Sequence, residues 1–311
     1  MRVFTSIEEA GRQIINPVVT TGSFDGVHVG HKMILKRINT LAREVNGESV
    51  LITFFPHPRK VLYPEYRNLQ LIASQEEKIE LLRQTGLNNV IIMQFTKAFA
   101  QTTSNAFVEK YLVQKLGVRK VVIGFNHHFG RNREGDLDHL LALGKKYNFE
   151  VEEIPEQDIQ NETVSSTKIR EAIHEGYIQK ANAYLDHYYI VTGNVTNVIM
   201  PYFDLGFPTC RVTIEEESKL IPATGTYAVT VNYNWNQFRA LAIIKNCQTP
   251  ENMQCASVAL DLLLLDNKAL DGRRVTLTFH KRISELPSEA DRILLKKTLE
   301  NAIIDTQELI Y

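Results

Sequence analysis

The sequence predicts an α/β domain built on a doubly wound parallel sheet, followed by an all-β domain that closes into a small antiparallel barrel. Two observations lead to this prediction. Apolar strand segments alternate with helical patterns in the first part of the chain, and from about residue 188 short β-rich segments follow one another between turns. The chain has 311 residues, enough for two cores, so we expect domains at 1–185 and 186–311.

The composition argues against a nucleic-acid or membrane partner. The chain has 35 Lys and Arg against 36 Asp and Glu, so no overall field attracts a polyanion or an anionic membrane. It has no apolar run of about 18 residues and no signal-peptide core, and its three cysteines form neither a disulfide framework nor a zinc motif. We therefore expect a cytoplasmic protein with small-molecule substrates. The sequence does not indicate an oligomeric state.

A strand, a tight turn and a helix are expected to meet at residues 21–31. This stretch follows the apolar residues 18–20 and precedes residues 32–45, whose apolar positions recur at the helical period. Its glycines let the backbone turn tightly, and the free N–H groups of the following helix favour an anion. His28 and His31 can donate hydrogen bonds to the same phosphate oxygens and stabilise their charge. The stretch therefore predicts a phosphate site with both histidines as catalytic residues.

The same stretch contains four further residues that we predict to bind the nucleotide, namely Gly22, Phe24, Asp25 and Gly30. Gly22 and Gly30 would let a nucleotide approach the backbone closely. Asp25 is either a ligand or a residue that forms the turn. The alternative for the whole stretch is a loop with two surface histidines, and a second anion-binding motif farther along the chain argues against that alternative.

Strands and helices alternate after this motif. Strands are expected at 49–55, 90–95, 121–125 and 150–154, and helices at 74–84, 104–116 and 136–147. The first of these helices begins with a capping box, in which Ser74 is the N-cap and Glu77 lies three residues on. This alternation implies a parallel sheet, in which ligands bind at the carboxyl ends of the strands. Polar motifs should therefore lie in the loops that follow the strands.

Two loops that follow predicted strands carry candidate ligand-binding residues. Residues 54–59 read Phe-Phe-Pro-His-Pro-Arg and contain His57, although the prolines are also compatible with a purely rigid loop. Residues 124–133 read Gly-Phe-Asn-His-His-Phe-Gly-Arg-Asn-Arg. Asn126, the two histidines after it and the two arginines suit an anionic ligand better than they suit a solvated turn.

A second phosphate site is expected at residues 164–170. These residues read Val-Ser-Ser-Thr-Lys-Ile-Arg and lead into a helix, which Ser165 or Ser166 can cap. The segment presents hydroxyl groups and cations to an anion at the helix N-terminus. These donors are Ser165, Ser166, Thr167, Lys168 and Arg170.

The second part of the chain has the pattern of a barrel. Six strands are expected at 189–195, 210–214, 226–233, 238–244, 257–265 and 274–279. A helix at 179–185 precedes them, and a helical pattern at 288–309 follows them. We expect this last helix to lie on the barrel.

These motifs resemble known families. The His-x-Gly-His sequence that ends at His31 and the later serine-rich segment resemble a nucleotidyltransferase superfamily. Nearly the whole chain resembles the bacterial bifunctional riboflavin kinase/FAD synthetase family, whose elements match residues 22–31, 54–59, 71–86, 124–133 and 165–170 in order. The resemblance implies a Rossmann-like nucleotidyltransferase domain and a riboflavin-kinase-like barrel. It also implies FMN adenylyltransferase activity, in which ATP and FMN give FAD and pyrophosphate with the help of Mg²⁺.

The resemblance also implies roles for the motif residues. The attacking group is the FMN phosphate, which is mostly ionised near neutral pH because its second pKa is about 6, so no strong base is needed. His28 and His31 would hold the α- and β-phosphates of ATP. The serine-rich segment with Arg170 would close on the β- and γ-phosphates, and Asn126 with the neighbouring histidines would bind the flavin phosphate.

The kinase half departs from the family pattern. A Gly-Phe-Pro-Thr segment is kept and ends at Thr209, a vestigial Mg²⁺ ligand, but Val198 and Tyr202 stand where the family has loop glycines. Arg211 replaces the asparagine that joins the threonine at the metal, so a cation stands in place of a cation ligand. The family's Arg-Pro-Thr-Phe segment reads Gln-Thr-Pro-Glu at 248–251.

The kinase base is the most serious departure. Counting back from Gly272 puts Leu260, give or take one residue, where the family kinases carry a glutamate. Asp261 is adjacent but on the opposite face of the strand, so it would serve only after a register shift. Because a ribityl hydroxyl needs a base, we expect a monofunctional FAD synthetase with a degenerate kinase barrel. The alternatives are a bifunctional enzyme with atypical kinase residues, which also phosphorylates riboflavin, and a non-catalytic flavin or nucleotide sensor.

Overall fold

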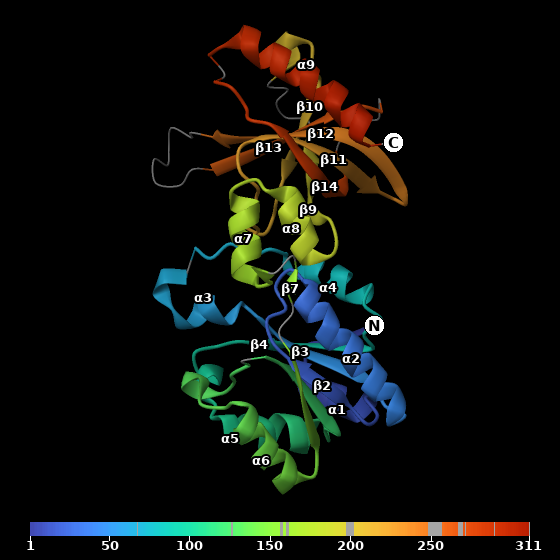
Figure 1. Ribbon diagram of the computed structural model, residues 1–311, viewed down its shortest axis with the longest axis vertical. Helices are drawn as coiled ribbons and strands as arrows, with labels where there is room; N and C mark the ends of the chain where they lie inside the picture. The colour runs from blue at the N-terminus through green and yellow to red at the C-terminus, as the bar shows by residue number, and fades with distance from the viewer. Residues whose placement is uncertain are drawn as a thin grey trace. The chain divides into compact units, whose positions relative to one another are not determined.

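The computed structural model describes residues 1–66, 68–125, 127–155, 158–159, 162–196, 202–247, 257–266, 270, 272–288 and 290–310. By their contacts these residues form two compact units (Figure 1). The first unit comprises 1–69 and 78–165, and the second comprises 70–77 and 166–311. The contact boundary therefore lies at residues 165–166, whereas the domain boundary at residue 185 stays a prediction.

The first unit contains a six-stranded sheet in which all neighbouring strands are parallel. Its strands are β1 (Arg2–Phe4), β2 (Val18–Thr21), β3 (Ser49–Phe55), β4 (Asn89–Gln94), β5 (Lys120–Gly124) and β6 (Glu150–Ile154), in the spatial order β1-β4-β3-β2-β5-β6. The predicted doubly wound sheet is confirmed. The chain moves outward from β2 through β3 and then returns to place β5 on the other side of β2, so the topological switch point lies between β2 and β5.

Helices connect these strands. They are α1 (Ile7–Gln13), α2 (Val29–Glu44), α3 (Pro58–Leu62), α4 (Gln75–Arg83), α5 (Ser104–Ala106), which continues as a π-helix over Phe107–Lys115, and α6 (Leu137–Tyr147). The core joins Val19, Val50 and Ile91 of the sheet to Val108 and Leu112 of the π-helix. The sequence analysis did not predict β1, α1, α3 or the π-helical geometry. Short 3-10 helices lie at Pro64–Tyr66, Phe99–Gln101 and Arg131–Arg133.

The second unit contains a closed antiparallel barrel and a terminal helix, as predicted (Figure 1). Its strands are β9 (Tyr189–Thr196), β10 (Thr209–Thr213), β11 (Gly225–Tyr233), β12 (Asn236–Cys247), β13 (Ser257–Leu264) and β14 (Arg274–Ser284), closed in the order β10-β13-β12-β11-β14-β9. Leu295 and Leu299 of α9 (Arg292–Leu309) pack against Leu241, Ile243 and Leu263. By its contacts α9 lies against β11, β12 and β14 of the barrel.

The remaining elements are small. Helices α7 (Ser166–His174) and α8 (Ile178–Leu185) belong to the second unit, and α8 contacts β9 and β14. A 3-10 turn lies at Phe203–Leu205, and β7 (Asp158–Ile159) pairs with β8 (Glu162–Thr163). No helix in the described part of the chain is long and apolar enough to cross a membrane.

A buried ion pair explains why residues 70–77 belong to the second unit. The Lys219 ammonium lies 2.8 Å from Glu77 Oε2, and the two side chains are 0% and 1% exposed. Lys219 also donates to the carbonyls of Ile72 (2.6 Å) and Ile190 (2.7 Å), while Glu77 accepts from the Thr192 N–H (2.7 Å). Both charges are thus paired and hydrogen-bonded, as a buried pair requires.

The predicted capping box at the start of α4 is confirmed. The Glu77 N–H donates to Ser74 Oγ at 3.1 Å, and the Ser74 N–H donates to Glu77 Oε2 at 2.8 Å. Glu77 therefore caps the helix and pairs with Lys219 at the same time.

Candidate nucleotide-binding site

The predicted phosphate motif lies at the switch point of the first unit. It connects the end of β2 at Thr21 to the start of α2 at Val29, and His28 is the N-cap residue. The turn between them is tight, because Phe24, Gly26 and Val27 all have positive φ angles of 49°, 79° and 43°. Left-handed backbone at two non-glycine residues costs energy and is concentrated at functional turns.

The two motif histidines form a stacked, enclosed pair. Their ring centroids are 3.6 Å apart with an interplanar angle of 21°, and Phe24 stacks on His31 at 4.4 Å. Burial, and then the nearby charges of His28 and Lys78, hold the pKa of His31 well below its usual range. Among the described residues its buried Nδ1 has no hydrogen-bond partner. His31 is therefore a neutral group, which can stabilise a phosphate by hydrogen bonding and not by a positive charge of its own.

The motif glycines make room for these rings. A Cβ atom on Gly30 would lie 3.3 Å from Cε1 of His28, and one on Gly22 would lie 3.1 Å from the Phe24 ring. Both distances are tighter than ordinary carbon contacts, so side chains here would press on the stack. The direct approach of a nucleotide to these glycines stays a prediction. Asp25 is buried at 3% exposure within the turn.

Lys78 is a cation that the sequence analysis missed. Its Nζ donates to the Ser23 carbonyl and to Thr53 Oγ1, each at 3.3 Å, and Thr53 Oγ1 also donates to the Ser23 carbonyl at 3.1 Å. The side chain is buried beneath the phosphate motif. The available signal was its spacing of three and four residues from Leu81 and Leu82, which places a lysine on the apolar face of α4.

His57 has a local structural role. It is the N-cap residue of α3, and its Nδ1 accepts the Arg59 N–H at 3.3 Å. It follows β3 and so lies at the carboxyl edge of the sheet, as predicted. The predicted ligand role of His57 is not tested by this contact.

The loop after β5 carries its positive charge on arginines. Asn126 lies outside the described residues. Desolvation, followed by the charges of His128 and Arg133, lowers the pKa of His127 to about 4, so this histidine is neutral near pH 7. Arg131 and Arg133 are exposed at the tip of the loop.

The serine-rich motif opens helix α7. The helix begins at Ser166, and Thr167 in its first turn is exposed. The Nε of Arg170 donates to the Gln70 carbonyl at 3.0 Å. Ser165 belongs to the first unit, and the residues of the motif from Ser166 onward belong to the second. That this motif binds the β- and γ-phosphates of ATP therefore stays a prediction.

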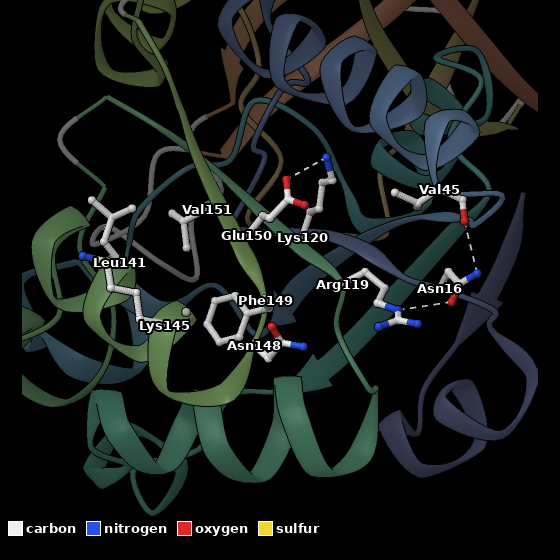
Figure 2. A pocket seen from close by; sticks show the side chains of 11 residues that line it. Asn16, Val45, Arg119, Lys120, Leu141, Lys145, Asn148, Phe149, Glu150 and Val151 are labelled. Carbon is white, nitrogen blue, oxygen red and sulfur yellow. Dashed lines mark hydrogen bonds and ion pairs between the residues drawn. The ribbon is translucent and has the colours of Figure 1, made fainter.

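A separate cavity of about 690 Å³ lies at the opposite edge of the sheet, where β5 and β6 begin (Figure 2). Two of the charged side chains that line it already have partners within the protein. Lys120 pairs with Glu150 at 2.8 Å, and Arg119 donates to Asn16 Oδ1 at 3.3 Å. None of the predicted site residues lines it.

The barrel carries a second polar cluster. Arg211 forms two parallel contacts with Asp261, with Nε 2.7 Å from Oδ1 and Nη2 3.2 Å from Oδ2. The register pairs Arg211 directly with Asp261, and Thr209 with Leu263, so these four residues share one face. Leu260 pairs with Val212 on the other face.

This register shows which residues near the predicted kinase base share a face with Thr209. Counting along the chain put Leu260 at the position of the base, but the carboxylate on the face of Thr209 and Arg211 belongs to Asp261. Which of these two adjacent residues stands at the position of the family's base stays a prediction, because the count from Gly272 allows a difference of one residue and such a difference exchanges the two faces. Tyr202 is fully buried against the α9 cluster, and Val198 and residues 248–251 lie outside the described residues.

Among the described residues, the predicted magnesium ligand Thr209 has no suitable partner for binding Mg²⁺. Its buried Oγ1 has no hydrogen-bond partner among the described residues, but both oxygens of Asp261 are engaged by Arg211. In the described part of the chain, no three His, Cys, Asp or Glu side chains gather as a metal site. The described residues of the barrel therefore do not fit Mg²⁺, which needs oxygen ligands without a competing cation.

Comparisons with known proteins agree with this two-part architecture. The FAD synthetase family model matches residues 12–168, and the riboflavin kinase family model matches residues 185–309. A bifunctional riboflavin kinase/FMN adenylyltransferase of Listeria monocytogenes is 33% identical over 86% of this chain and 80% of its own length. A Bacillus subtilis protein of the same name is 30% identical over 94% of this chain and 91% of its own.

Two further similarities are informative. A second Listeria monocytogenes protein, named FAD synthetase, is 34% identical over 68% of this chain and 79% of its own length. A crystal structure from Streptococcus pneumoniae, described as a macrolide-efflux protein, has a TM-score of 0.85 at 24% identity and covers 98% of both chains, which supports the fold alone. Since the FAD synthetase model spans half of the chain and near-full-length relatives reach 30% identity, the chain belongs to the bacterial riboflavin kinase/FMN adenylyltransferase family.

Proposed function

We propose that this protein is an FMN adenylyltransferase, which transfers AMP from ATP to FMN and releases pyrophosphate. The observation that carries the proposal is the stacked His28 and His31 pair at the N-terminus of α2, beside the switch point of a doubly wound sheet. The match of residues 12–168 to FAD synthetase supports it. Nucleotide ligands bind at such switch points because strand ends and helix N-termini converge there.

The reaction needs positioning more than proton transfer. An oxygen of the FMN phosphate attacks the α-phosphorus of ATP, and the bond from that phosphorus to the bridging oxygen breaks as pyrophosphate leaves with the electron pair. The attacking phosphate is already ionised near pH 7. The protein must therefore hold two polyanions in line and stabilise the charge on the α-phosphate and the leaving group.

The described residues supply donors for this task. His28 and the neutral His31 would hydrogen-bond the α- and β-phosphates, while the Lys78 charge and the N–H groups of α2 stabilise their negative charge. In this proposal Ser165, Ser166 and Arg170 close on the β- and γ-phosphates. The loop after β5 binds the flavin phosphate through its exposed arginines.

We infer that Mg²⁺ enters with ATP. Magnesium is usually held by substrate phosphates, water and one or two protein oxygens, so a dedicated cage of protein ligands is not needed for it. Bound in this way, the ion neutralises phosphate charge.

We further propose that the barrel does not phosphorylate riboflavin. The Asp261 carboxylate is fully buried and both of its oxygens contact the Arg211 guanidinium, which argues against a role as the base for a hydroxyl group or as a metal ligand. The bifunctional alternative is favoured by one observation, the position of Asp261 on the face of Thr209. The names of the relatives from Listeria monocytogenes and Bacillus subtilis also support that alternative.

Product analysis tests both proposals. The purified protein is incubated with ATP and Mg²⁺ and with FMN or riboflavin offered separately. FMN should yield FAD, and riboflavin should yield neither FMN nor FAD. If no FAD forms from FMN, the adenylyltransferase proposal is overturned. Steady formation of FMN from riboflavin would overturn the proposal that the barrel does not phosphorylate riboflavin. The Thr209→Ala variant is the control, because it should leave the conversion of FMN to FAD unchanged.

A further inference from the structure

The loop after β5 ends in a compact, closed tip, which we call the arginine loop and define as residues 129–135. Its ends are joined by an antiparallel bridge, in which the Phe129 N–H donates to the Gly135 carbonyl (3.0 Å) and the Gly135 N–H donates back (2.9 Å). The tip is a 3-10 turn over Arg131–Arg133. Among the described residues, neither the Arg131 nor the Arg133 guanidinium makes a hydrogen bond or salt bridge.

The arginine loop packs on the start of the helix at 104–115 without spare room. A Cβ atom on Gly130, where φ is +77°, would lie 2.5 Å from the backbone nitrogen of Ser104. A Cβ atom on Gly135 would lie 2.7 Å from the Phe129 ring. The Arg131 N–H donates to the Thr102 carbonyl at 2.9 Å. The backbone on both sides of the tip is therefore held in place.

A side-chain network completes this attachment. Glu134 Oε1 accepts the backbone N–H of Ser104 at 2.8 Å and lies 3.3 Å from its Oγ. Ser104 Oγ lies 3.0 Å from His139 Nε2. The consistent donor order is His139 to Ser104 and Ser104 to Glu134, because the carboxylate only accepts. We call Ser104, Glu134 and His139 the loop anchor.

The loop anchor also determines which group the Glu134 carboxylate binds. The Ser104 N–H is one of the free donors at the first turn of its helix, and a carboxylate is favoured there. The hydrogen bond from that N–H is the main reason that the pKa of Glu134 is lowered, so the carboxylate is ionised. Held in this way, Glu134 does not form a salt bridge with the neighbouring Arg131 or Arg133.

We propose that Ser104, Glu134 and His139 are positioning residues that hold Arg131 and Arg133 ready for the phosphate of the flavin substrate. This rests on the proposed adenylyltransferase function. The arginine loop follows β5, and β5 is the parallel neighbour of β2. The predicted phosphate motif begins at the end of β2. Because the backbone that carries the two guanidinium groups is already fixed, only their side chains have to be ordered when they bind a phosphate.

Loosening the anchor should therefore weaken flavin binding without changing the ATP site. The Glu134→Ala variant should raise the KM for FMN about fivefold, an order-of-magnitude scale for the added cost of ordering the loop backbone on binding. The KM for ATP and kcat should stay close to those of the wild type. The Glu134→Gln variant keeps an oxygen acceptor for the Ser104 N–H and should recover part of the loss.

Limited proteolysis with trypsin tests the anchor without relying on activity. Cleavage after Arg131 or Arg133 in the substrate-free protein should be faster in Glu134→Ala than in the wild type. The control is Glu150→Ala, which removes a side chain that is 73% exposed at the opposite edge of the sheet. It should show wild-type cleavage and wild-type kinetics.

The outcomes separate this inference from the proposed function. A wild-type protein that makes no FAD overturns the proposed function and the flavin role together, whereas the trypsin comparison still decides the anchor. Equal cleavage rates in Glu134→Ala and the wild type overturn the anchor. An active Glu134→Ala variant with faster cleavage but an unchanged KM for FMN overturns the role in flavin binding.

Discussion

Arg211 and Asp261 are direct cross-strand neighbours in the barrel, and the Arg211 guanidinium donates to both oxygens of the Asp261 carboxylate. The Asp261 side chain is 0% exposed. The family resemblance implies a metal-binding asparagine at the position of Arg211. The structure instead shows an internal cation that neutralises the acid facing Thr209. Arg211 is thus a cation at the position where the resemblance implies a cation ligand, and it also occupies both oxygens of the neighbouring carboxylate.

This pair predicts an asymmetric response to substitution. Arg211→Ala should lower the free energy of unfolding by about 3–5 kcal/mol, because it leaves a buried carboxylate unpaired. Asp261→Asn should cost less, since the Arg211 side chain is 27% exposed and can reach water. Urea unfolding of the two variants and of the double variant measures the coupling. Equal losses in both single variants would contradict the asymmetry.

The buried pair of Lys219 and Glu77 predicts a local release of residues 70–77. Lys219→Met removes the cation and the two hydrogen bonds to carbonyls, so we expect a loss of about 3–5 kcal/mol. The Leu71 N–H donates to the Ser218 carbonyl, and its hydrogen exchange should be faster in the variant than in the wild type. Exchange in the core strand β11 should change much less. Uniform acceleration over both regions would contradict a local role. Lys297→Met, on the exposed side of α9, is the matched control.

His31 should act as a neutral donor in the transfer step. His31→Ala should lower kcat about 100-fold or more, the scale for loss of one donor that stabilises developing charge. His174→Ala, at the exposed end of α7, removes an imidazole elsewhere and should leave kcat unchanged. Steady-state rates with FMN and ATP give the comparison. A His31→Ala enzyme with the wild-type kcat would exclude this role.

The lowered pKa of His127 predicts that the free energy of unfolding falls in mild acid. Unfolded His127 binds a proton below about pH 6.5, whereas the folded form does so only below about pH 4. Between these values the unfolded state binds more protons, so stability falls as the pH drops, by at most about 1.4 kcal/mol per pH unit. The lowered pKa of His31 acts in the same direction.

Urea midpoints at pH 7.5 and pH 5 measure this dependence. The His127→Gln variant lacks the titrating ring, so its midpoint should fall less between the two pH values than that of the wild type. An equal fall in both proteins would show that His127 does not contribute.

Most elements followed from local pattern. The bounds of β3 and β6 agree with the predicted strands at 49–55 and 150–154. The apolar run of β3 gives a clear strand signal, whereas β6 reads Glu-Val-Glu-Glu-Ile and gives a weaker one. The strand β1 was missed because it has only three residues, two of them exposed. The short α3 begins at Pro58, two residues after Pro56, and these prolines also suit an irregular loop.

The candidate site was predictable in part. The glycines and histidines of residues 22–31 predict the turn that leads into α2, where phosphate binding stays a prediction, and the Glu77 capping box predicts the start of α4. Lys78 was missed because a lysine on a helix with acidic neighbours resembles a solvated residue. Only packing shows that its ammonium reaches Ser23 and Thr53, which are 55 and 25 residues away in the chain.

The sequence by itself determined the order of the two folds, the turn between β2 and α2 and the departures from the kinase pattern, because these depend on residue type and on short-range periodicity. Tertiary structure alone decided that His31 is neutral, that Asp261 and not Leu260 faces Thr209, and that Glu134 is held by Ser104. Burial, cross-strand register and contacts between distant residues depend on how separate segments pack. No local pattern in the chain carries that information.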